Sequence, residues 1–104
     1  MYAIAAYRSK KGKEGLLREV LKDHVPILRK ERLVTDRTPY LMRAADGIFI
    51  EVFEWRSAAA IRSAHENAAV QAMWARFEEA CTYESLVNLS ESKEMFANFE
   101  SVDL

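Results

Sequence analysis

Residues 48–55 read Ile-Phe-Ile-Glu-Val-Phe-Glu-Trp, and this short stretch constrains the fold more than any other part of the chain. Its β-branched and aromatic residues are typical of a strand, and side chains along a strand alternate between the two faces of a sheet. One face carries the aliphatic side chains Ile48, Ile50 and Val52. The opposite face carries aromatic side chains around one carboxylate: Phe49, Glu51, Phe53 and Trp55. Two apolar faces need two covers, so we expect helices on one side and a second copy of the chain on the other.

The length of 104 residues predicts a single domain over residues 1–104, with residues 90–104 as a docked C-terminal tail. Fifteen Lys and Arg against sixteen Asp and Glu give no indication of a nucleic-acid or membrane-surface partner. No apolar run approaches the ~20 residues of a membrane span, and no signal peptide is visible, so we expect a cytoplasmic protein. Cys81 is the only cysteine, which excludes an intrachain disulfide, and we interpret it as a buried, inert thiol.

The spacing of apolar residues predicts strands at residues 2–7, 38–44, 48–55 and 83–89. It predicts helices between them, at residues 16–28, 57–65 and 67–81. Ser57 and Asn67 are suited to cap the second and third helices, and Pro26 predicts a kink or a restart of the first helix near Val25. Met95, Phe96 and Phe99 predict one docked helical turn in the tail.

This order predicts an α+β fold: a ferredoxin-like βαββαβ unit whose four-stranded antiparallel sheet carries the helices on one face. The uncovered face should pack against the sheet of a partner, giving a two-fold homodimer, a dimeric α+β barrel. Asp46-Gly47 predicts a two-residue hairpin turn, which would place Met42 opposite Glu51 and Tyr40 opposite Phe53. Tyr40 would then share a face with Trp55, although a slip of one residue would reverse this.

Residues 51–57 (Glu-Val-Phe-Glu-Trp-Arg-Ser), Ala64-His65 and residues 70–74 (Val-Gln-Ala-Met-Trp) together resemble the antibiotic biosynthesis monooxygenase-like family of dimeric α+β barrel proteins. The resemblance covers roughly residues 2 to 90. It implies a pocket between the sheet and the helices of each protomer and, for some members, oxidation of polycyclic phenolic substrates without metal or flavin.

In the aromatic-polyketide branch of this family, the resemblance implies an active-site set of Asn, Trp and Tyr. Trp55 matches the Trp position, whereas Glu51 and Ile61 occupy the positions of the Asn and the Tyr. The haem-degrading branch carries an Asn on its first strand, which is missing here, so haem degradation is not expected.

Two residues are candidates for acid–base catalysis. Glu51 stands alone in an apolar strand, and burial disfavours an ionised carboxylate, which would make Glu51 a stronger base. Alternatively, it pairs with an arginine such as Arg37 or Arg43. His65 is a candidate acid–base partner or substrate donor, but it also suits the last turn of a short helix, where a cation is favourable.

Aromatic side chains are the candidate substrate-binding residues: Tyr40, Phe53, Trp55 and Trp74. Trp74 also fits the core, because it lies on a helical apolar stripe. His24 and His65 are far apart in sequence and there is no Gly-rich phosphate loop, so we expect neither a metal nor a nucleotide cofactor.

The sequence therefore leads to a hypothesis of cofactor-independent monooxygenation of a small aromatic or quinol-like compound. The alternative is a non-catalytic small-molecule-binding or structural homodimer of the same fold.

Overall fold

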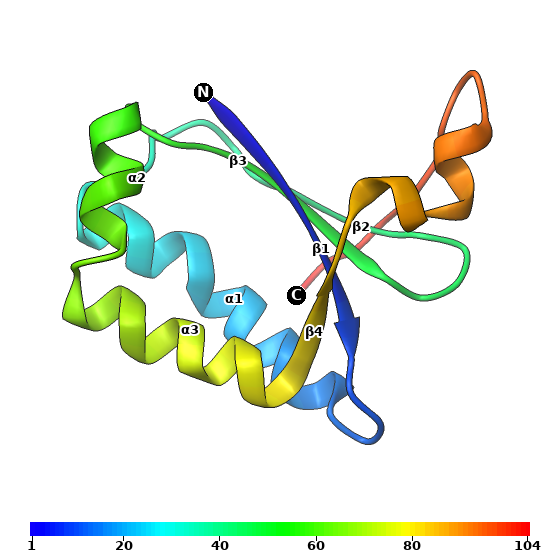
Figure 1. The fold of residues 1–104 in the computed structure, drawn as a ribbon, viewed down its shortest axis with the longest axis horizontal. Coiled ribbons are helices and arrows are strands. Elements are labelled where there is room, and N and C mark those ends of the chain that lie inside the picture. The colour runs from blue at the N-terminus through cyan, green and yellow to red at the C-terminus, as the bar shows by residue number, and fades with distance from the viewer.

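The computed structural model describes all residues, 1–104, as one α+β unit with its helices on one side of an antiparallel sheet (Figure 1). The elements are β1 Tyr2–Ser9, α1 Glu14–Lys30, β2 Tyr40–Arg43, β3 Phe49–Glu54, α2 Ala58–Ala64, α3 Ala68–Ala80, β4 Cys81–Glu84 and β5 Glu100–Ser101. The strand order is β4-β1-β3-β2-β5. The α+β class is confirmed and the arrangement is compatible with a ferredoxin-like fold, but the sheet has five strands instead of the four predicted.

Side-chain caps begin the two shorter helices, as the sequence predicts. The Ser57 hydroxyl accepts from the main-chain N–H of Ala60 at 3.1 Å, and the Asn67 side chain accepts from that of Val70 at 3.0 Å. α1 runs without a break through Pro26, so the predicted restart near Val25 is wrong. The proline ring lies on the exposed side of α1, while the buried stripe on both sides of it keeps the helix against the sheet.

The β2–β3 hairpin has a register one residue away from the predicted one. Ala44 pairs with Ile48 across a three-residue loop, Gly47 donates to the carbonyl of Ala44, and Gly47 has a φ of +95°. A three-residue loop with glycine in a left-handed conformation replaces the two-residue turn. Leu41 therefore lies opposite Glu51, and Tyr40 lies opposite Val52. The predicted position of Tyr40 on the face of Trp55 is wrong.

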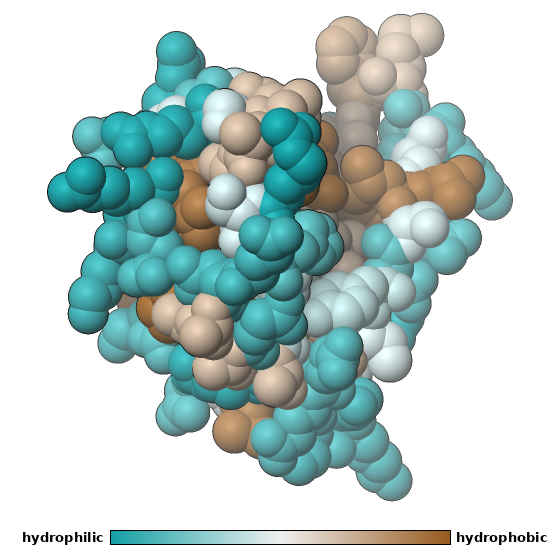
Figure 2. Space-filling view, turned by 60° about the vertical axis from the view of Figure 1, so that its left-hand side comes forward, coloured by the Kyte–Doolittle hydropathy of each residue, from teal (hydrophilic) through white to brown (hydrophobic).

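The main core lies between the sheet and the helices α1 and α3. β3 contributes Phe49 and Phe53, and the helices contribute large apolar side chains such as Leu17, Leu28 and Phe77. Hydrophilic residues cover most of the helical layer, with apolar groups visible between them (Figure 2). None of the helices is long and apolar enough to cross a bilayer.

The other face of the sheet is covered only in part, by the segment that follows β4. Leu89 and Phe99 pack there against Ile48 and Ile50 in a small second cluster. β4 ends at Glu84, and two 3₁₀ turns follow, so the predicted strand is wrong for residues 85–89. The chain leaves the sheet edge because Leu89 becomes buried on this opposite face.

The tail differs from the predicted docked helical turn. Residues 90–93 form a 3₁₀ turn, Met95 and Phe96 are 91% and 79% exposed, and only Phe99 packs against the sheet. The segment projects from the body before it returns as β5, which pairs with β2 (Figure 1). Main-chain pairing of residues 100–101, and not a helical turn, therefore holds the tail.

Candidate functional site

Three buried polar side chains meet inside the main core: Tyr7, His24 and Glu51. Nδ1 of His24 lies 2.7 Å from Oε1 and 2.9 Å from Oε2 of Glu51. The hydroxyl of Tyr7 donates to Oε1 of Glu51 at 2.9 Å. Each of the three residues is at least 95% buried. Glu51 thus has a histidine and a tyrosine as partners, not an arginine: Arg43 pairs with Glu14, and Arg37 pairs with Glu54.

Strand pairing and the buried stripe of α1 bring these three side chains together. Ala5 of β1 pairs with Glu51 of β3, and Tyr7 follows two residues later, so Tyr7 and Glu51 point to the same side of the sheet. His24 belongs to the buried stripe of α1 and therefore faces them. The rings of Phe53 and Phe77 meet the imidazole edge-on, with centroids 5.3 Å and 4.9 Å away. These rings hold the plane of His24.

The second nitrogen of His24 is open to a cavity. Nε2 makes no hydrogen bond, yet no buried side-chain nitrogen or oxygen in the protein lacks a partner. Nε2 must therefore be accessible, and His24 indeed lines an aromatic cavity of about 440 Å³. A neutral imidazole that donates from Nδ1 to Glu51 presents the lone pair of Nε2 to this cavity.

Tyr7 acts as a fixed donor to Glu51. Burial, with the nearby charge of Glu51 as the next cause, raises the pKa of Tyr7 well above its ordinary value. The hydroxyl consequently keeps its proton across the physiological range. Because Tyr7 and His24 both donate to Glu51, the ionised carboxylate is well supported in this apolar setting.

The aromatic cavity collects three of the four predicted substrate-binding residues: Phe53, Trp55 and Trp74. Glu51 does not line it; it stands behind His24 and borders a second hollow of about 370 Å³, together with Tyr40. His65 also lies outside the cavity, at the exposed end of α2, where its ring meets that of Trp74 with centroids 5.0 Å apart. The structure thus brings the aromatic residues together but places His24, not His65, beside Glu51.

His24 is the functional residue that sequence reasoning missed, although a signal was present. It lies among leucines and valines on the buried stripe of α1, and Glu51 is the one carboxylate on the inner face of β3. A polar side chain on a buried face must find a partner. The isolation of each group on its own apolar surface therefore indicated that each needs a buried polar partner, although the sequence does not specify which one.

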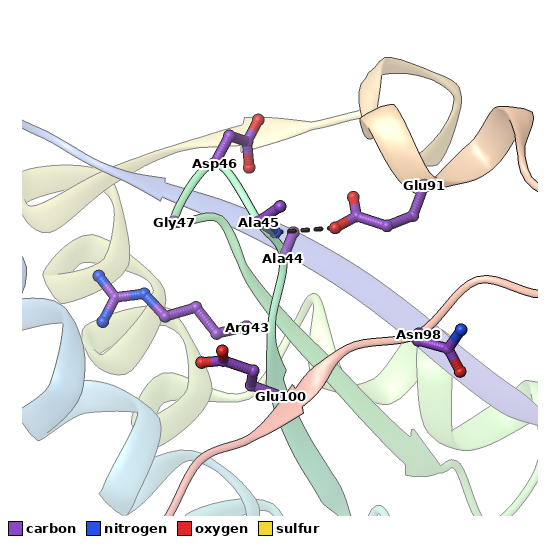
Figure 3. Close-up of a pocket in the computed structure, with 8 residues that line it drawn as sticks. All are labelled: Arg43, Ala44, Ala45, Asp46, Gly47, Glu91, Asn98 and Glu100. Atoms are coloured by element: carbon purple, nitrogen blue, oxygen red, sulfur yellow. Dashed lines mark hydrogen bonds between the residues drawn. The ribbon is translucent and has the colours of Figure 1, made fainter.

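A larger hollow of about 530 Å³ lies elsewhere, around the β2–β3 turn, and its walls are mostly polar (Figure 3). There the Glu91 carboxylate accepts from the main-chain N–H of Ala45 at 2.7 Å, and Arg43 and Glu100 lie beside each other. It holds neither His24 nor an aromatic ring, and its carboxylates, Asp46, Glu91 and Glu100, lie around an open polar hollow. No group of three or more His, Cys, Asp and Glu residues in the protein is placed to hold a metal ion.

Comparison with known proteins does not assign this site. The chain matches no family model, no curated protein and no solved structure. The functional argument therefore rests on the geometry of the cavity and its residues.

Proposed function

We propose that the protein is a cofactor-independent monooxygenase that acts on a small aromatic or quinol-like compound, with His24 as its base. The observation that carries this proposal is the free Nε2 of His24 in an aromatic cavity, with Nδ1 held by the buried carboxylate of Glu51. The same reaction class is what the resemblance of residues 51–57, 64–65 and 70–74 to antibiotic biosynthesis monooxygenase-like proteins implies for some members of that family. Glu51, predicted as the base, becomes the positioning residue.

His24 would begin the reaction by taking a phenolic proton through Nε2. Glu51 then stabilises the imidazolium, as the carboxylate of a catalytic triad does. The electron-rich phenolate can transfer electrons to molecular oxygen. A quinol would become a hydroxyquinone, and an activated methylene would become a carbonyl; in each case the product keeps one oxygen atom of O2 and the other leaves as water. Both reactions balance without a metal or a flavin.

Oxygen consumption with a panel of phenols and quinols tests this proposal. His24→Asn and Glu51→Gln should each reduce turnover by about 10²–10⁴-fold, the usual share of a positioned base. His65→Asn is the control, because His65 lies outside the cavity and touches only its lining residue Trp74, so turnover should change by far less than in His24→Asn. Equal turnover in the wild type and His24→Asn would exclude His24 as the base.

The alternative function is small-molecule binding without chemistry. Six aromatic rings around one cavity would favour such binding even if no reaction followed. Tight binding of phenols by calorimetry, with no oxygen consumed by any of them, would support this alternative over the enzyme.

The outer face of the sheet supports a homodimer. Ile4 and Tyr40 are 52% and 62% exposed there. Tyr2 and Leu86 are also large, exposed hydrophobic residues, 51% and 41% exposed. Leu89 and Phe99 already cover Ile48 and Ile50 of β3, so a second copy, related by a two-fold axis, would cover the part of this face around Ile4 and Tyr40. A cytoplasmic location stays a prediction.

A further inference from the structure

We propose that the aromatic cavity selects an organic cation, a small aromatic compound that carries an ammonium group, through six aromatic rings and the carboxylate of Glu78. The inference rests on the proposed function, because it names the substrate class of the same cavity. The evidence is the composition of the cavity wall and the position of the nearby charges.

The wall is a nearly continuous set of aromatic rings. Tyr7 and Phe77 stack with centroids 4.9 Å apart, and Tyr83 meets Tyr7 edge-on at 5.9 Å. On the other side, Phe53 and Trp55 lie 5.2 Å apart, and Trp74 completes the lining. Ring faces carry negative electrostatic potential, and cages of several rings are the usual binding sites of ammonium groups.

The fixed charges around the cavity also favour a cationic ligand. Glu78 of α3 is the only acidic residue in the lining, and neither lysine nor arginine lines the cavity. Its carboxylate forms no ion pair. Lys10 is close, but it donates to the main-chain carbonyl of Glu78 and does not belong to the lining. An anionic ligand would find no fixed cation, whereas a cation would find a free carboxylate.

His24 does not add a net positive charge to the cavity. Its Nδ1 is held by Glu51, so a positive imidazole is neutralised by the carboxylate behind it. The same residue gives the ligand its second feature, since Nε2 is an acceptor for a phenolic hydroxyl. The cavity therefore fits a phenol at the His24 end and an ammonium group against the rings.

Calorimetric titration of the full chain with three phenols of similar shape tests the inference. They are para-hydroxyphenyltrimethylammonium, para-tert-butylphenol and para-hydroxybenzoate, which differ in charge at one end. The cation should bind about 10-fold tighter than the neutral tert-butyl compound, and the carboxylate should bind weakest. Equal or tighter binding of the neutral compound, or tightest binding of the carboxylate, would overturn the inference.

Glu78→Gln supplies the residue-level test. Glu78 is exposed, so the variant should fold, and it should lose most of the preference for the cation over the neutral compound. Glu79→Gln is the matched control: the neighbouring carboxylate lies outside the cavity and pairs with Lys13. An equal loss in both variants would mean that general surface charge, not Glu78, attracts the cation.

These experiments can refute the proposed ligand class and the proposed reaction independently of each other. Selective cation binding without oxygen consumption would remove the proposed reaction and leave the ligand class. Turnover of neutral or acidic phenols, with no preference for the cation in binding, would remove the proposed ligand class and leave the proposed reaction.

Discussion

The pairing of His24 with Glu51 unites the two polar side chains that stand alone on the buried faces of α1 and β3. Burying such a pair seldom adds stability, because desolvation offsets much of the attraction between the groups. Its value lies in fixing one tautomer of the imidazole. The first predictions therefore concern single residues.

The tautomer of His24 should depend on Glu51. Neutral His24 should carry its proton on Nδ1, since only that nitrogen faces the carboxylate. In Glu51→Gln the amide can accept from Nδ1–H or donate to a bare Nδ1, so both tautomers become populated. Nitrogen chemical shifts of the imidazole measure this directly. Glu54→Gln, on the opposite face of β3, is the control, and a wild-type ring protonated on Nε2 would refute the proposed base.

Cys81 should make the protein sensitive to alkaline pH. Burial raises the pKa of its thiol from 9.0 to about 11. Above pH 9 the unfolded chain loses this proton while the folded protein keeps it, so folding stability falls until about pH 11. Between pH 8 and 10.5 the wild type should lose about 2 kcal/mol more than Cys81→Ala.

Urea unfolding at the two pH values provides the measurement for Cys81. Burial is the main cause of the raised pKa values of Tyr7 and Tyr83, and this cause is common to the two proteins, so most of the tyrosine effect is removed by the comparison. Parallel losses in the two proteins would show that Cys81 contributes nothing to the pH dependence.

At the scale of elements, the periodicity of apolar residues predicted the three α-helices and the first three strands. The errors lie in the β2–β3 loop and at the end of β4. Apolar spacing and caps depend on neighbours in sequence, so α2 and α3 begin at Ser57 and Asn67 as predicted. The hairpin register depends on one extra loop residue, which Asp46-Gly47 does not reveal. The end of β4 depends on where Leu89 becomes buried, and this is a tertiary event.

The β2–β3 loop should be sensitive to the conformation of Gly47. Gly47→Ala should cost about 1–2 kcal/mol, because φ is +95° and the added carbon would make only ordinary contacts with Arg43. Gly15→Ala, inside the first turn of α1 with open space around it, should stabilise by up to about 1 kcal/mol. Thermal unfolding compares the two; a neutral Gly47→Ala would contradict the three-residue loop.

At the scale of the whole molecule, the sequence predicted a site between sheet and helices, and the cavity lies there. It predicted the aromatic wall better than the His24–Glu51 pair, because aromatic residues on one strand face share a wall whatever they contact. The partner of Glu51 depends on how α1 crosses β3, which no spacing within one element specifies. The exposed tail was likewise unpredictable, since its place depends on what covers the outer face.

The dimer proposal predicts a change of mass with a single substitution. Wild type should sediment at twice the monomer mass at micromolar concentration. Ile4→Asp should dissociate it into folded monomers, because a charge would be buried without a partner. Leu16→Asp, 42% exposed on α1, is the matched control and should remain a dimer. A wild type that sediments as a folded monomer would refute the outer-face interface.

The hydrogen bonds to Glu51 span 27 residues to His24 and 44 residues to Tyr7. β1, α1 and β3 each contribute one of the three side chains, so the hydrogen bonds to Glu51 form only when these elements have packed together. A collapsed state with native helices but loose packing would keep the circular dichroism of α1 and lose the alignment of the imidazole. The nitrogen resonance of His24 thus serves as a built-in indicator of completed folding, independent of any ligand.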